Sequence, residues 1–298
     1  MPLDPATAPS ESAAMESEAA IEPAEAPEAK AGAPKESWWA TLRFLLILFI
    51  AALALRSFIV APFSIPSRSM LPRLYIGDYL FVAKWPYGYS RYSFPLAFPG
   101  FEGRLFGGLP ESGDVVVFRY PGPRNEDLVK RVIGLPGDTI QVRGGVVILN
   151  GRPLPRQRIA DAGFPVSPNS PCLAPFDRPG RTVAGENGET LCLMPRYVET
   201  LPDGRSYEVL DQLPNARADD FGPVTVPADH VFVMGDNRDD SADSRFPTMA
   251  GGVGMLPVDN LLGRVMINFW STDGSAEWIK PWTWFSAARW SRIGRTGA

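Results

Sequence analysis

The chain has 298 residues, a formal net charge of −4 and a hydrophobic content of 45%. This length can bury a full core, and the ordinary hydrophobic content excludes both a polytopic membrane protein and a wholly disordered chain. The basic residues form no cluster of the kind that binds nucleic acid, so we expect no nucleic-acid partner. His230 is the one histidine, which excludes a histidine-rich metal site and makes it the one imidazole base open to a Ser-His-Asp hydrolase. We expect no metal and no cofactor.

The N-terminal segment, residues 1–37, is acidic and rich in Ala, Pro, Glu and Ser. Residues 1–36 hold eight acidic side chains against Lys30 and Lys35, and they include no aromatic residue. Such a composition cannot bury enough apolar surface to offset the chain entropy that folding removes. We therefore predict a disordered tail.

The next segment, residues 38–62, is strongly apolar, and Phe44–Leu55 is an uninterrupted run of twelve apolar residues. About 20 residues at roughly 1.5 Å each cross about 30 Å of hydrocarbon, so the segment suits a transmembrane helix. Arg43 and Arg56 lie near its ends, where long side chains can reach the headgroups. The alternatives are a buried core helix and a signal peptide cleaved at Ala52-Leu53-Ala54. That triplet lies inside the apolar run and follows a long acidic region, which favours a membrane anchor.

After the helix the sequence is typical of β structure, with short runs of β-branched and aromatic residues bounded by Gly, Pro, Asp or Asn. Asn150-Gly151, for example, is a strong hairpin signal. We expect a mainly β fold, with an antiparallel β-sheet domain built from residues 63–151 and 225–270. Residues 152–224, which hold both cysteines, are expected to form an inserted, smaller and less regular subdomain. Residues 271–298 are rich in Trp and Arg, which suits either the membrane interface or packing on the β core.

Two serines, Ser67 and Ser69, lie two residues apart in a proline-bounded loop just after the apolar helix. A serine hydroxyl is a weak nucleophile until a base removes its proton. A lysine amine can be that base if burial lowers its pKa enough to leave it neutral near pH 7. Lys130 lies in the predicted strand Leu128–Ile133, where alternation places it on one face and Arg131 on the other. Lys130 can therefore face the core, although two solvated bases on an edge strand would give the same pattern.

A third segment, Gly235–Arg245, is dense in Asp, Asn, Ser and Arg and follows an apolar strand. It is not a calcium loop, because Arg238 stands where a ligand would be needed, but an ordinary polar loop would fit. Together, the two serines, Lys130 with the Gly-Leu-Pro-Gly-Asp that follows its strand, and this segment resemble bacterial type I signal peptidases. That family consists of membrane-bound Ser/Lys endopeptidases that remove signal peptides from exported proteins. The resemblance covers about residues 57–149 and 225–267.

The resemblance implies a catalytic role for three residues. Ser69 would be the nucleophile and Lys130 the general base. The backbone N–H of Ser69 and the hydroxyl of Ser67 would form the oxyanion hole. Cleavage would follow small residues, as in Ala-x-Ala, because shallow apolar pockets admit only small side chains. These pockets would be lined by Phe63, Ile65, Met70, Leu74 and Leu80.

The resemblance also assigns supporting roles. Ser241 would hydrogen-bond and orient the lysine amine, while Asp243 and Arg245 would form a salt bridge that holds the loop. Two positions depart from the family: Arg68 stands where Gly is frequent, and Arg73 stands where Thr is usual. Neither departure removes a group that the mechanism needs, but both place charge near the cleft.

The same resemblance implies a single-pass protein of the bacterial inner membrane, with a cytoplasmic N-terminus and a periplasmic β domain. Its partners would be the signal peptides of preproteins and the lipid bilayer. Cys172 and Cys192 would then lie in an oxidising space, and we expect a disulfide between them.

Two rival interpretations fit less well. A catalytically inactive, membrane-tethered β module that binds peptides would be expected to lack Ser69, Lys130 or Ser241, and all three are present. Among other Ser/Lys enzymes, self-cleaving SOS-type repressors carry a DNA-binding domain instead of a membrane helix. Penicillin-binding enzymes need Ser-x-x-Lys, a motif that this chain lacks.

Overall fold

The computed structural model describes residues 38–94, 100–174, 178–186, 188–213, 216–277 and 279–296. The predicted disorder of residues 1–37 lies outside the described residues. Helix α1 (Trp38–Ala54) continues into a π-helical turn, η1 (Leu55–Ile59). Together they form a helix of 22 residues that contains an 18-residue window with a mean hydropathy of 2.2, so it is long and apolar enough to cross a membrane. The helix ends before residue 62, its expected bound, because strand β1 already begins at Val60.

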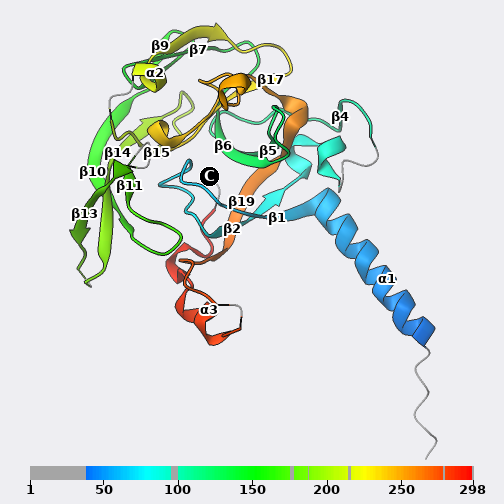
Figure 1. The fold of residues 1–298 in the computed structure, drawn as a ribbon. Helices are drawn as coiled ribbons and strands as arrows, with labels where there is room; N and C mark the ends of the chain where they lie inside the picture. The colour runs from blue at the N-terminus through cyan, green and yellow to red at the C-terminus, as the bar shows by residue number, and fades with distance from the viewer. Residues whose placement is uncertain are drawn as a thin grey trace, which may run out of the picture. The chain divides into compact units, whose positions relative to one another are not determined.

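A seven-stranded antiparallel sheet follows the helix in sequence (Figure 1). Its central strand β5 is buried on both faces, because Val115 and Val117 join one apolar cluster while Val116 and Phe118 join another. The sheet is therefore covered on both sides in its middle. In sheet order, its strands are β1 (Val60–Ser64), β2 (Asp78–Ala83), β19 (Leu261–Ser271), β5 (Val115–Arg119), β6 (Asp127–Gly134), β17 (His230–Met234) and β18 (Leu256–Pro257).

A second antiparallel sheet is built from two hairpins and a returning strand. The turn at Asn150-Gly151 has positive φ at both residues (52° and 74°), as a two-residue hairpin loop requires. Strand β16 pairs with β7, so its residues belong to this sheet and the expected insertion 152–224 ends earlier than predicted. In sheet order, the strands are β16 (Phe221–Thr225), β7 (Thr139–Arg143), β8 (Val146–Leu149) and β9 (Arg152–Pro153).

The inserted part contains a third sheet (Figure 1). Two of its strands, β10 and β14, have 10 and 11 residues, longer than the composition of this region led us to expect. Cys172 and Cys192 are joined by a disulfide with a Cα–Cα distance of 5.2 Å. The strands of this sheet are β10 (Arg156–Pro165), β14 (Thr190–Thr200), β13 (Arg181–Ala184) and β15 (Ser206–Leu210), and the short pair β11 (Leu173–Ala174) and β12 (Arg178–Pro179) lies nearby in sequence.

The C-terminal segment has exposed aromatic side chains and then returns to the main sheet. Trp282 and Phe285 are largely exposed, while the N–H of Asn268 in β19 donates to the carbonyl of Arg295 (2.9 Å). Contact of this segment with lipid stays a prediction. The remaining short elements are η2 (Trp85–Tyr87), β3 (Tyr89–Ser90), η3 (Arg91–Ser93), β4 (Arg104–Leu105), α2 (Ala216–Asp219), η6 (Arg238–Asp240), η7 (Thr248–Ala250), η8 (Val258–Asn260), α3 (Trp282–Ser286) and η9 (Trp290–Arg292).

Candidate active site

The structure brings Ser69 and Lys130 into direct contact. Ser69 lies in the loop between β1 and β2, and Lys130 lies in the middle of β6. The Nζ of Lys130 and the Oγ of Ser69 are hydrogen-bonded at 2.6 Å, and the two residues are only 4% and 8% exposed. Burial lowers the pKa of the Lys130 amine to about 8, against the opposing effect of nearby carboxylates. A substantial fraction of the amine is therefore neutral in mildly alkaline solution and can accept the serine proton.

The second serine lies beside the first. The hydroxyl oxygens of Ser67 and Ser69 are 3.3 Å apart. Asn237 holds the backbone of this turn from the other side, because its N–H donates to the carbonyl of Ser69 (3.1 Å) and its side-chain amide donates to the carbonyl of Arg68 (3.2 Å). These two hydrogen bonds fix the turn to the segment Gly235–Arg245.

Asp243 and Arg245 form a buried ion pair. The Nη2 of Arg245 lies 2.9 Å from the Oδ2 of Asp243, which also accepts the N–H of Gly235 (3.0 Å). Burial alone would raise the pKa of the Asp243 carboxyl, but the charge and hydrogen bonds of Arg245 hold that pKa below its usual range. The carboxylate therefore stays ionised and anchors the loop.

Ser241 packs against the same turn. A Cβ on Gly235 would lie 2.3 Å from the Oγ of Ser241 and 2.6 Å from the carbonyl oxygen of Ser69, so only glycine fits there. The Ser241 hydroxyl is buried and lies close enough to Asp243 to help lower the pKa of that carboxyl. No hydrogen bond joins it to Lys130 among the described residues, and the orienting role stays a prediction.

Sequence reasoning missed two buried ion pairs beside the site. Arg131 is on the opposite face of β6 from Lys130, yet it is only 3% exposed and pairs with Asp236 (2.7 Å). Arg238 pairs with Glu199 of β14, and both residues are nearly inaccessible to solvent. The partner of Arg238 comes from the inserted sheet, so no local pattern in the sequence could reveal it.

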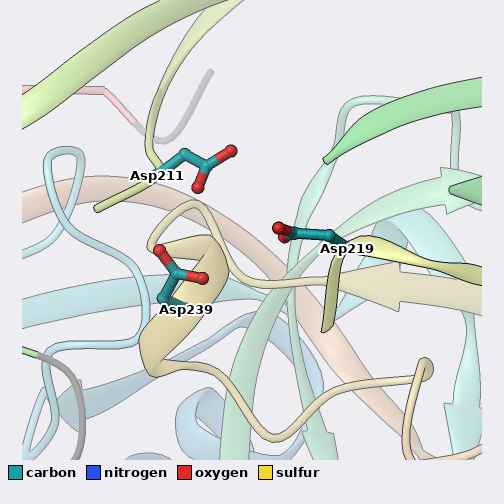
Figure 2. A group of neighbouring side chains, drawn as sticks. All are labelled: Asp211, Asp219 and Asp239. Atoms are coloured by element: carbon teal, nitrogen blue, oxygen red, sulfur yellow. The ribbon is translucent and has the colours of Figure 1, made fainter. Parts of the chain in front are cut away.

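Three carboxylates gather next to this segment, from Asp211, Asp219 and Asp239 (Figure 2). One oxygen of each lies within 4.8 Å of the others. Burial raises the pKa of Asp239 to about 6, and the charges of the other two carboxylates add to that effect. Asp211 pairs with Arg156, and Asp239 accepts hydrogen bonds from the backbone N–H groups of residues 212 and 213. The group therefore ties the inserted part to η6.

The residues expected to line the substrate pockets lie together. Four of them are buried in one apolar cluster, and Phe63 packs against it partly exposed. Because this cluster includes Met70, the residue after Ser69, it adjoins the turn that carries Ser69. Its role in selecting substrates stays a prediction. The four buried members are Ile65, Met70, Leu74 and Leu80.

His230 is not part of this constellation. It starts β17, whereas the site-bearing segment follows the other end of that strand. Its Nδ1 lies 2.8 Å from the carbonyl oxygen of Ala228, and its side chain lines a separate hollow with Arg104 and Pro257. A histidine base for Ser69 therefore has no support from the geometry.

Comparisons with known proteins show the family to which the chain belongs. The family model described as signal peptidase, peptidase S26, matches residues 38–270. Signal peptidase I of Rickettsia akari (strain Hartford) is 32% identical over 282 residues, covering 88% of this chain and 92% of the relative. Signal peptidase I of Rickettsia typhi (strain ATCC VR-144 / Wilmington) is 34% identical over 271 residues, covering 84% and 90%.

A solved signal peptidase I from Enterococcus faecalis V583 is 22% identical, with a TM-score of 0.27, and covers 53% of this chain and 97% of that chain. The match of the family model and the identity to the two rickettsial proteins together decide the assignment. The chain belongs to the signal peptidase family, peptidase S26.

Proposed function

We propose that this chain is a membrane-anchored serine endopeptidase that cleaves N-terminal signal peptides from exported preproteins after small residues. Ser69 is the nucleophile and Lys130 the general base. The observation that carries the proposal is the 2.6 Å contact between the Ser69 hydroxyl and a buried amine whose pKa is lowered to about 8.

The reaction follows from this pair. Neutral Lys130 accepts the hydroxyl proton of Ser69 while the Ser69 oxygen attacks the scissile carbonyl. Lys130 then donates that proton to the leaving amine. The hydroxyl of Ser67, 3.3 Å from the Ser69 oxygen, and the N–H of Ser69 stabilise the negative oxygen of the tetrahedral intermediate. Water, deprotonated by Lys130, then hydrolyses the acyl-enzyme.

The main sheet offers edges for an extended substrate. Strand β1 pairs with β2 on one side and lies at the end of the seven-stranded sheet. Strand β17 pairs with β6 from Arg131 onward, whereas Asp127–Lys130 pair with β5 alone among the described strands. A peptide strand bound along β1 or along Asp127–Lys130 would gain main-chain hydrogen bonds and present alternate side chains to the apolar cluster next to Ser69. A close-packed cluster of this kind would admit alanine and reject bulky residues.

We also propose that helix α1 anchors the chain in the bacterial inner membrane, with the N-terminus in the cytoplasm and the β domain in the periplasm. The length and apolar character of Trp38–Ile59 support the anchor. The disulfide between Cys172 and Cys192 supports an oxidising location for the β domain.

The test is cleavage of a purified preprotein with an Ala-x-Ala site by the full-length protein in detergent. The wild type should cut after the second Ala and should fail on a preprotein with Phe at that position. Ser69→Ala and Lys130→Ala should each lower the rate at least about 1,000-fold. Ser286→Ala, at an exposed position, and Lys280→Ala, at a partly exposed position, both near the C-terminus, serve as controls. An inactive wild type, or full activity of Ser69→Ala, would overturn the proposal.

A further inference from the structure

Arg68, which stands between the two serines of the site, makes contacts that hold it in one orientation. Its Nε lies 2.9 Å from the Oδ2 of Asp240, and its side chain is 13% exposed. Its Nη1 donates to the backbone carbonyl of Leu173 (3.2 Å). One guanidinium thus bridges the turn that carries Ser69, the 3-10 turn η6 and the inserted part. A planar fork with several donors suits such a bridge.

The inserted part is itself fixed at this point. Leu173 follows Cys172, whose disulfide to Cys192 joins this loop to β14. Cys192 also belongs to the apolar cluster that contains Leu71, two residues after Ser69. The carbonyl that Arg68 contacts is therefore held by a covalent link and by packing against the turn.

The charges around Lys130 follow a pattern. Burial is the largest influence on the Lys130 amine, and three carboxylates oppose it by favouring the charged form: those of Asp243, Asp236 and Asp240. Each of the three has an arginine within ion-pair distance, because Arg245 pairs with Asp243, Arg131 with Asp236 and Arg68 with Asp240. A neutral base beside three carboxylates needs such compensation.

The Arg68–Asp240 pair differs from the other two in its exposure. The side chains of Arg68 and Asp240 are 13% and 25% exposed, whereas those of the other two pairs are at most 4% exposed. A substitution in the partly exposed pair leaves no unpaired charge deep in the core. The effect of that substitution on the pKa of Lys130 can therefore be measured in a folded protein. The nearest further acidic residue is Asp239 in the same 3-10 turn, whose carboxylate lies close to those of Asp211 and Asp219.

We propose that Arg68 is a positioning residue for the reaction: it offsets the charge of Asp240 next to the Lys130 base and clamps the Ser67–Ser69 turn to the loop that carries Cys172. This inference rests on the proposed function of Ser69 and Lys130. Under this proposal Arg68, which stands where glycine is frequent in the family, is part of the catalytic arrangement of this chain.

The experiment measures kcat/KM against pH for the full-length protein in detergent with an Ala-x-Ala preprotein. The acidic limb of this profile is the pH range in which kcat/KM rises as Lys130 loses its proton. Arg68→Gln should move this limb to higher pH by about half a pH unit, because loss of the positive charge beside the remaining Asp240 carboxylate raises the pKa of Lys130. Asp240→Asn should move the limb to lower pH by a similar amount. At a pH below the limb these shifts correspond to changes of about 3-fold in opposite directions.

A third variant separates the charge from the clamp. Arg68→Lys keeps the positive charge, so its limb should stay with the wild type, but a single ammonium cannot bridge both acceptors and kcat should fall several-fold. Arg158→Gln and Asp161→Asn change a partly exposed pair on β10 by the same charges and should leave the pH profile unchanged.

The proposal is overturned if Arg68→Gln and Asp240→Asn leave the limb where it is in the wild type, or move it in the same direction. A general loss of folding would lower activity without moving the limb in opposite directions. If Arg68→Gln does not fold, Arg68→Lys decides: the proposal predicts an unshifted limb with a several-fold lower kcat, and a wild-type kcat would overturn it. Full activity of Ser69→Ala would instead refute the proposed function, so the two failures are distinguishable.

Discussion

Replacing Lys130 with methionine should stabilise the fold while abolishing activity. Folding lowers the pKa of the amine from its ordinary value of 10.5 to about 8, because burial disfavours the charged form. At about 1.36 kcal/mol for each tenfold change in acidity, this difference corresponds to about 3 kcal/mol of lost stability at pH 7. Loss of the hydrogen bond to Ser69 costs about 1 kcal/mol, so Lys130→Met should gain about 2 kcal/mol.

The gain should depend on pH with a definite sign. Below the folded pKa of about 8, both the folded and the unfolded chain carry the proton, and the full penalty applies. As the pH rises from about 8 toward 10.5, the folded amine loses its proton first and the penalty disappears.

Denaturant unfolding in detergent, followed by tryptophan fluorescence at pH 7 and pH 10, measures this difference. The matched control is Lys280→Met at a partly exposed position, which should change stability by less than about 0.5 kcal/mol. A Lys130→Met variant that is less stable than the wild type at pH 7, or whose gain does not shrink at pH 10, would refute the reasoning.

Three further predictions follow from the site. The kcat/KM of the wild type should rise tenfold per pH unit and level off above about pH 8, the pKa of Lys130. A profile that levels off above about pH 6.5 would instead indicate a histidine as the general base. Arg238→Met should destabilise the fold by about 3 kcal/mol because the buried Glu199 carboxylate loses its main ion-pair partner and keeps only the Tyr207 hydroxyl and the more distant Arg156; adding Glu199→Leu should recover most of that loss in denaturant unfolding. Asp239→Asn should stabilise the fold by about 1 kcal/mol at pH 7 and by less at pH 4, since burial raises the folded pKa of this partly exposed carboxyl to about 6; an equal effect at both pH values would contradict this.

The sequence predicted those features that local patterns determine. The apolar run of Trp38–Ile59 indicated a spanning helix by length alone, and strand alternation placed Lys130 and Arg131 on opposite faces of β6. Alternation could not show that Arg131 is also buried, because its cover includes Tyr207 from the inserted sheet. The contact between Ser69 and Lys130 likewise joins two distant segments, and only the family resemblance connected them beforehand.

The boundaries of the inserted part were harder to predict for a physical reason. Gly222 and Pro223 are residue types that normally interrupt a strand, yet they lie inside β16, where the register with β7 shifts between Phe221 and Val224. A bulge of this kind accommodates the residues that normally end a strand. The sheet of β10 and β14 was underestimated because its frequent polar, Pro and Gly residues hide the strand pattern.

The central claim, that Ser69 forms the acyl-enzyme with Lys130 as its base, is tested most directly by trapping that intermediate. The full-length protein would be mixed with a peptide ester whose acyl part ends in Ala-x-Ala, then quenched and measured by intact mass and peptide mapping. One added acyl group is expected on Ser69 in the wild type, and none in Ser69→Ala or Lys130→Ala. An adduct on another residue, or an undiminished adduct in Ser69→Ala, would contradict it.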